Sequence, residues 1–156
     1  MSKATIETRL AGIGLDLPML PEYSKAFLPG VVVGDLLFMS AQAWTRDGAA
    51  VVRGAVGADV DVADAIEAAR QCALNGLAAA KMLIGSLDEI ERVVRVVGYV
   101  RSAPGFDKQP AVVGGASDFL AELFGEAGRH ARTSIGVAEL GGGASVLIEL
   151  TLQRKA

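Results

Sequence analysis

The segment from Asp61 to Gly85 constrains the fold of this chain more than any other part of the sequence. Its apolar side chains recur at helical spacing, and the face they form is mostly alanine with one glycine, Gly76. Asp61 and Asp64 are typical of a helix start, and Gly85 is placed to end the helix in a left-handed conformation. Because the side chains are small, the helix axis can approach a β-sheet closely. The apolar positions are Val62, Ile66, Ala69, Ala73, Leu77, Ala80 and Ile84.

Strand-favouring runs lie on both sides of this helix. Val31–Val33 and Leu36–Ala41 are separated by Gly34-Asp35, a dipeptide that favours a hairpin. Asp47-Gly48 predicts a second turn, with a return strand around 51–53. After the helix, Ile90–Val100 is rich in β-branched residues and predicts a long central strand.

The carboxyl-terminal third predicts a second helix and two strands. Pro110 can start a helix that continues through Phe124 and stops at Gly125. The strands are expected at 133–138 and 145–152, and the glycine-rich stretch between them at 140–143 suits a hairpin turn that needs positive φ.

The amino-terminal residues 1–26 are interpreted as an extension to this core. Ile6, Leu10 and Ile13 predict a short helix, and Gly14, Pro18 and Pro21 then predict an irregular segment. The whole chain, 1–156, is expected to be one α+β domain, with a mixed sheet and two main helices packed on one face. The other face of such a sheet would be uncovered, and self-association is the expected cover.

Composition excludes several classes of partner. The formal charge is -3 and aromatic residues make up only 5%, so nucleic acid is not expected as a partner. The longest stretches without charge cover ten residues, too few for a membrane helix, so no membrane partner is expected. Cys72 is the single cysteine, and the amino terminus lacks the pattern of a secretory signal, which together predict a cytoplasmic protein.

Most residues with reactive side chains have a plainer interpretation. His130 is the only histidine, so neither a histidine metal cluster nor a histidine-paired triad has a second imidazole, and a surface or packing role is expected. Cys72 falls on the apolar face of the first long helix, where a thiol is usually a small buried hydrophobe. No metal or other cofactor is expected.

Arg132 is the strongest candidate for a binding residue. It opens a predicted strand in which Arg132, Ser134 and Gly136 share one face. Few carboxylates are near it in sequence, and its planar guanidinium suits a ligand carboxylate. Taken alone, this pattern also fits a solvated arginine at the end of a strand.

Several blocks of the sequence resemble the Rid (YjgF-like) reactive-intermediate deaminase family, in its longer subgroup. The resemblance covers about residues 27–150, with the blocks in the family's order and spacing. The blocks are Val33-Gly34-Asp35-Leu36-Leu37-Phe38-Met39-Ser40-Ala41-Gln42, the helix residues 68–77, Gly105-Phe106, 110–118 and Phe124-Gly125-Glu126-Ala127-Gly128-Arg129-His130-Ala131-Arg132.

The resemblance implies a chorismate-mutase-like fold, assembled as a homotrimer with clefts between subunits. It implies that Arg132 grips the carboxylate of a 2-imino or 2-keto acid, as the catalytic arginine of an imine deaminase. It also implies that the substrate-binding residues are Arg132, Ser134, Ser40, Ala41, Phe27, Gly114 and Leu147.

This sequence departs from the family at four of these positions. Leu147 stands where active members have the glutamate that positions water, and a leucine cannot accept a proton. Ala41 replaces a glycine, Phe27 a tyrosine, and Gly114 an asparagine. Glu149 faces the same side as Leu147 but is two residues further along the strand.

Two functions remain open from the sequence. One is the hydrolysis of imines or enamines to keto acids and ammonia, and the other is the binding of a small carboxylate without turnover. Arg132 fits both functions, whereas Leu147 argues against the first. An endoribonuclease activity, often attributed to relatives, finds no support in basic patches or interleaved aromatic residues.

Overall fold

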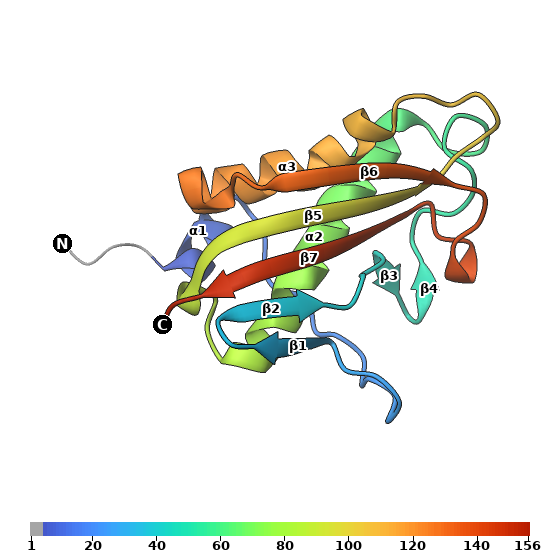
Figure 1. Ribbon diagram of the computed structural model, residues 1–156. Coiled ribbons are helices and arrows are strands. Elements are labelled where there is room, and N and C mark those ends of the chain that lie inside the picture. Colours follow the sequence, from blue (N-terminus) through green and yellow to red (C-terminus); the bar gives the residue numbers. More distant parts are fainter. Residues whose placement is uncertain (1–4) are drawn as a thin grey trace.

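The computed structural model describes residues 5–156 as a sheet covered on one face by two long helices. The elements are α1 (Ile6–Gly12), β1 (Gly30–Val33), β2 (Leu36–Met39), β3 (Thr45–Arg46), β4 (Ala49–Ala50), α2 (Val62–Ile84), η1 (Leu87–Glu89), β5 (Ile90–Arg101), α3 (Gln109–Phe124), η2 (Gly125–Gly128), β6 (Ala131–Val137), η3 (Gly141–Gly143) and β7 (Val146–Arg154). Five strands form the main sheet in the order β1-β2-β7-β5-β6. Only β5 and β6 are parallel neighbours. Both α2 and α3 lie behind this sheet in Figure 1, so the predicted α+β arrangement, a mixed sheet with helices on one face, is confirmed.

Small residues let the two layers approach closely. The alanine face of α2 is buried, and a Cβ at Gly76 would lie 2.8 Å from Leu150 Cδ1 of β7. A Cβ at Gly98 of β5 would overlap Val113 of α3. The predicted close approach of helix and sheet is therefore confirmed, and it extends to α3.

Side chains of β7 alternate cleanly between the two faces of the sheet. Val146, Ile148, Leu150 and Leu152 of β7 are buried against the helices. The residues between them, which include Leu147 and Glu149, are only partly buried and face the other way. β7 therefore has one core face, toward the helices, and one helix-free face.

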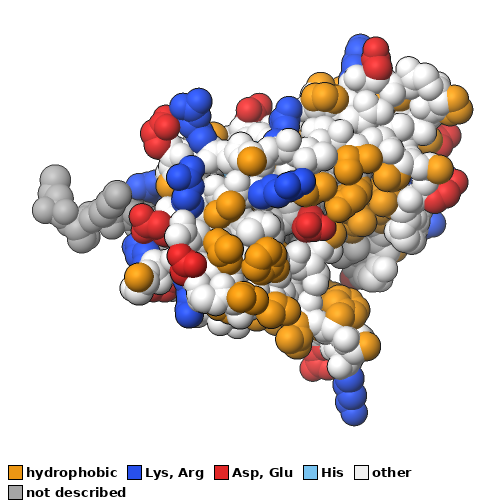
Figure 2. Space-filling model, viewed as in Figure 1, with side chains coloured by type: hydrophobic (Ala, Val, Ile, Leu, Met, Phe, Trp, Pro, Cys, Tyr) orange, Lys and Arg blue, Asp and Glu red, His pale blue; other side chains and the backbone are white. Residues whose placement is uncertain are grey.

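The helix-free face carries apolar and charged side chains together. Phe38 and Ile135 are exposed on it, and Arg95 and Glu149 share it. Figure 2, which views this face, shows hydrophobic side chains gathered over β1 and β2 with charged groups around them. The uncovered face is therefore mixed and not wholly apolar, because much of the valine of β5 is buried under the helices instead.

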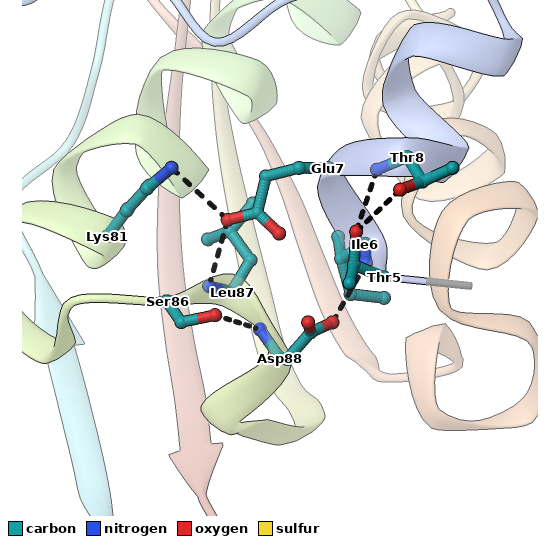
Figure 3. Close-up of polar contacts among 8 residues, drawn as sticks. All are labelled: Thr5, Ile6, Glu7, Thr8, Lys81, Ser86, Leu87 and Asp88. Carbon is teal, nitrogen blue, oxygen red and sulfur yellow. Dashed lines mark hydrogen bonds and ion pairs between the residues drawn. The ribbon is translucent and has the colours of Figure 1, made fainter. Parts of the chain in front are cut away.

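The amino-terminal helix α1 is fixed to the turn that follows α2. The amide of Ile6 donates to Asp88 Oδ1 at 2.8 Å, and Glu7 Oε1 lies 3.3 Å from Lys81 Nζ (Figure 3). On its other side, Arg9 donates to the carbonyl oxygen of Leu123 in α3 at 3.0 Å. These contacts place the predicted short helix against the end of the helix layer.

The last two strands do not form the hairpin that the sequence predicted. They lie on opposite sides of β5, and β5 pairs with both, parallel to β6 and antiparallel to β7. The glycine-rich connection crosses the end of β5, where Arg101 N donates to Ser145 O and Ser102 N to Val137 O. The positive φ angles of Gly142 and Gly143 therefore let the chain cross the end of β5, and they do not form a turn between two paired strands.

The return strand predicted around residues 51–53 is also misplaced. Asp47 and Gly48 do form a turn with positive φ, but the strand after it is 49–50. The following residues bond to the glycine-rich connection instead, through Ser145 N to Val52 O and Gly54 N to Gly143 O. These contacts are remote in sequence, so local patterning could not reveal them.

Candidate functional site

Arg132 lies near the start of β6, an edge strand, on the side of the sheet that faces α3. Its register partner on β5 is Val96, which is fully buried under the helices. The guanidinium donates from Nη1 to Ser117 Oγ of α3 at 3.2 Å. Arg132 is exposed and, within residues 5–156, forms no ion pair with a carboxylate. A cation held in place but left unpaired is suited to an anionic ligand.

His130 stands beside Arg132 and is hydrogen-bonded at both ring nitrogens. Nδ1 lies 2.6 Å from the carbonyl oxygen of Gly128, and Nε2 lies 3.0 Å from Ser117 Oγ. Burial lowers the pKa of His130 below its ordinary value, and the charge of Arg132 lowers it further, although the bond to Gly128 acts in the opposite direction. The imidazole is therefore neutral at pH 7.

An open pocket of about 260 Å³ brings these side chains together. Its charged groups are two arginines and one aspartate, so its local charge favours an anion. The lining residues are Ser117, Asp118, Ala121, Gly128, Arg129, His130 and Arg132.

Two further predicted site residues lie on the same side of the sheet as Arg132. Ser134 pairs with Gly98, and a Cβ built on Gly98 would point toward Val113 of α3, so Ser134 faces the helices as well. Gly114 lies one helical turn before Ser117 on α3, and nothing lies within 4 Å of a Cβ built on it. Arg132, Ser134 and Gly114 thus make up the group of predicted site residues on the helix side of the sheet.

Leu147 lies on the opposite face of the sheet from this group. It pairs with Tyr99 of β5, and both face away from the helices. Tyr99 donates from its hydroxyl to Glu149 Oε2 at 3.1 Å, and burial together with this carboxylate raises the pKa of Tyr99. The sequence therefore placed Glu149 correctly beside Leu147, but one chain does not bring Leu147 to Arg132.

Phe27, Ser40 and Ala41 gather at the end of β2, next to β7. Ser40 donates from Oγ to the carbonyl oxygen of Leu28 at 2.7 Å, and Phe27 packs edge-on against Tyr23 with ring centroids 5.8 Å apart. The neighbouring pairs of β2 and β7, Phe38 with Thr151 and Gln42 with Ile148, place this segment alongside 148–151. The predicted site residues thus fall into two groups in one chain.

The sequence did not single out Ser117 as a site residue, and it predicted only a surface or packing role for His130. Ser117 sits in the middle of α3, thirteen residues before its partner His130, and inside the motif block 110–118, but the motif does not assign it a role. The available signal was that positions 130 and 132 lie two residues apart at the start of a strand and can therefore point the same way.

Within the part of the chain that the structure describes, no group of three or more His, Cys, Asp or Glu residues is placed to hold a metal ion, and no helix is long and apolar enough to cross a membrane.

Comparison with known proteins gives one consistent result. Residues 7–147 match the family model described as "YjgF/chorismate_mutase-like, putative endoribonuclease". Protein TCP17 of Trypanosoma cruzi is 33% identical over 154 residues, which are 98% of this chain and 96% of that protein. The structure of Atu1372 from Agrobacterium tumefaciens is similar at a TM-score of 0.88, with 42% identity over 96% of this chain and 92% of the other. The structure of a Shewanella oneidensis protein described as a "putative endoribonuclease" has a TM-score of 0.91 and 32% identity over 96% of this chain and 99% of the other. A match over most of the chain, in sequence and in fold, means that this protein belongs to the YjgF-like (Rid) family with the chorismate-mutase-like fold.

Proposed function

We propose that this protein binds a small 2-imino or 2-keto carboxylate at Arg132 and hydrolyses the imine to a keto acid and ammonia. The observation that carries the proposal is the guanidinium of Arg132, which is fixed by Ser117, open to solvent and without a carboxylate partner within residues 5–156. Such a group can hold a ligand carboxylate through two parallel hydrogen bonds. The TdcF protein of E. coli, which shares the fold at 18% identity and a TM-score of 0.59, was solved with bound serine, itself a small carboxylate.

The binding cleft, in this proposal, lies between the subunits of a homotrimer. The group around Arg132 and the group around Leu147 occupy opposite faces of one sheet, so one chain cannot close a cleft with both. A neighbouring copy that covers the helix-free face would bring its own Arg132 group to the Leu147 group of the first. The exposed Phe38 and Ile135 support such an interface, because they would be buried in it.

The alternative is a trimer that binds the carboxylate without turnover. Leu147 supports this alternative, because it cannot orient water where active relatives are expected to have a glutamate. Leu147→Glu separates the two functions. If the parent only binds, this variant should gain imine hydrolysis. If the parent already hydrolyses as fast as the variant, another group handles the water.

The proposal is tested by measuring hydrolysis and binding on the same preparations. A small 2-imino acid generated in place, with keto acid trapped as its semicarbazone, reports hydrolysis, and calorimetry with pyruvate reports binding. Arg132→Ala should weaken pyruvate binding by about 1–3 kcal/mol, the usual contribution of a charge-assisted hydrogen bond. Arg46→Ala, which removes an exposed arginine of β3 outside both groups, is the matched control. Unchanged affinity in Arg132→Ala, or collapse of its melting temperature, would show that the arginine is structural.

A further inference from the structure

We propose that Ser117 and His130 form the proton-transfer pair of the Arg132 pocket, with Ser117 Oγ holding the attacking water and His130 Nε2 accepting its proton. This inference rests on the hydrolysis proposed above. It supplies the proton acceptor that Leu147 cannot provide, from Ser117, which is bonded to Arg132, and from His130, which is bonded to Ser117.

The hydrogen bonds of His130 fix which nitrogen carries the proton. The carbonyl oxygen of Gly128 can only accept, so Nδ1, 2.6 Å away, is the donor. In the neutral ring Nε2 is then unprotonated and accepts the hydroxyl proton of Ser117, at 3.0 Å. A hydroxyl, a base and a third group that orients the base are the arrangement that activates oxygen for attack.

Ser117 has one acceptor site left after these contacts. A hydroxyl has one donor and two lone pairs. The donor is used by His130 Nε2, and one lone pair accepts Nη1 of Arg132 at 3.2 Å. The remaining lone pair is free for a water in the pocket of about 260 Å³ that Ser117, His130 and Arg132 line together. A carboxylate on Arg132 would therefore bring the adjacent imine carbon next to this water.

The reaction balances with water as the only co-reactant. The water oxygen bonds to the iminium carbon, and one electron pair of the carbon–nitrogen double bond moves to nitrogen. One water proton passes to Ser117 Oγ while the hydroxyl proton of Ser117 passes to His130 Nε2, which gives a neutral carbinolamine and an imidazolium. The proton then returns along the same path to the amine nitrogen.

The second half regenerates the pair. The carbinolamine hydroxyl gives its proton through Ser117 to His130 as the carbon–oxygen double bond forms, the carbon–nitrogen bond breaks and ammonia leaves. Ammonia then takes the proton of the imidazolium. Iminium and water have become keto acid and ammonium, and both side chains are restored.

The surroundings of His130 keep it available as an acceptor at neutral pH. Burial and the charge of Arg132 lower its pKa, so the unprotonated ring is the main form at pH 7. The charged groups around it are Arg132 on β6, Arg129 in the preceding segment and Asp118 on α3, of which the two arginines oppose protonation and the aspartate favours it. A bound substrate carboxylate would partly offset the arginines and make the ring a better base once the site is filled.

Kinetics of variants at Ser117 and His130 test the pair. Ser117→Ala and His130→Gln should each lower kcat by about 10²-fold or more, the usual contribution of general base catalysis. His130→Gln should change pyruvate affinity little, whereas Ser117→Ala should also weaken it, because the Arg132 guanidinium loses its hydrogen-bond partner. The double variant should be no slower than the slower single variant, because the two groups act as a unit. Added imidazole should restore part of the activity of His130→Ala. Ser86→Ala, a serine at the start of η1 and outside the pocket, is the matched control and should keep the parent kcat.

The single histidine gives a second measurement that does not depend on turnover. Its ring protons in a nuclear magnetic resonance titration belong to His130 without assignment. Pyruvate should raise the pKa of His130, because an anion beside the ring stabilises the imidazolium, and Ser117→Ala should shift the titration in the absence of ligand. The parent kcat/KM should fall at acid pH as the ring is protonated, and His130→Gln should lack this dependence.

The outcomes separate this inference from the proposed function. A parent that hydrolyses the imine while Ser117→Ala and His130→Gln remain as fast overturns the pair alone. A parent that binds pyruvate but hydrolyses no imine overturns the proposed hydrolysis and the pair with it. A His130 signal that saturating pyruvate does not move also overturns the pair.

Discussion

Cys72 illustrates how burial decides the chemistry of a single residue. It lies in the interior of α2 without exposed surface, and its thiol donates to the carbonyl oxygen of Val146 at 3.5 Å. Burial raises the pKa of the thiol to about 12, so almost no reactive thiolate forms at neutral pH. The residue is a small apolar packing group, as its place on the alanine face predicted.

We expect native Cys72 to resist thiol reagents. Its reaction with an aromatic disulfide reagent at pH 7.5 should be limited by protein opening and become immediate in denaturant. The measurement is absorbance of the released thiol against time, with free cysteine as the control. Rapid labelling of the folded protein would mean that the core around α2 opens readily.

Two adjacent glycines of α3, Gly114 and Gly115, have opposite surroundings, and only Gly115 is needed for packing between elements. A Cβ at Gly115 would overlap the carbonyl oxygen of Ile66 in α2, whereas a Cβ at Gly114 meets nothing within 4 Å. Both positions are helical, so only the neighbouring helix distinguishes them.

We expect opposite effects from the same substitution at these two positions. Gly115→Ala should lower the free energy of unfolding by about 1–3 kcal/mol or more, because the backbone of α2 cannot move aside cheaply. Gly114→Ala should raise it by about 0.5–1 kcal/mol through helix propensity. Urea unfolding of both variants checks this, and equal effects would contradict the close contact of the two helices.

The docking of α1 should depend on pH through Glu7. Burial raises the pKa of this carboxyl, but hydrogen bonds from its own amide, from Lys81 and from the amide of Leu87 outweigh it, so the net pKa is lowered. A lowered pKa stabilises the fold above the ordinary value near 4.5, and that contribution disappears as pH falls through the lower folded value.

Glu7→Gln tests this dependence. The variant should be less stable than the parent by about 0.5–1 kcal/mol at pH 7, a small value because the pair is partly exposed, and equal to it near pH 2. Thermal unfolding across this range gives the difference. A constant difference at all pH values would mean that the charge of Glu7 makes no contribution.

At the scale of the whole molecule, the proposed cleft depends on assembly, because the Arg132 group and the Leu147 group lie on opposite faces of the sheet. If a trimer joins Arg132 of one copy to the Leu147 group of the next, a mixed trimer of two differently damaged chains regains an intact cleft. Arg132→Ala removes the cation from one half and Leu147→Trp fills the other half with a bulky side chain, so neither homotrimer should bind pyruvate well.

Mixing these two variants should therefore restore part of the binding. After joint refolding, each mixed trimer has one intact cleft. In that cleft Arg132 comes from the chain that carries the Leu147 substitution, and Leu147 comes from the Arg132→Ala chain. Sedimentation equilibrium should show trimers of the parent at micromolar concentration, and calorimetry should show recovered pyruvate sites only in the mixture. A monomeric parent, or no recovery in a mixture shown to contain mixed trimers, would place the site within one chain.

The sequence by itself determined the elements of this protein. Helical periodicity between Asp61 and Gly85, β-branched residues from 90 to 100 and the stop at Gly125 gave both long helices and the central strand, because these signals are local and act within a few residues. The same patterns, with the motif blocks, identified the family and singled out Arg132.

The tertiary structure alone decided what lies beside what. No local pattern reveals that β5 separates β6 from β7, because strand order is set by contacts between residues far apart in sequence. The pairing of Ser117 with His130 and the separation of Arg132 from Leu147 depend on the same long-range packing. Residue types and spacing could propose the chemistry of the site, but only the approach of α3 to β6 brings its hydroxyl, imidazole and guanidinium together.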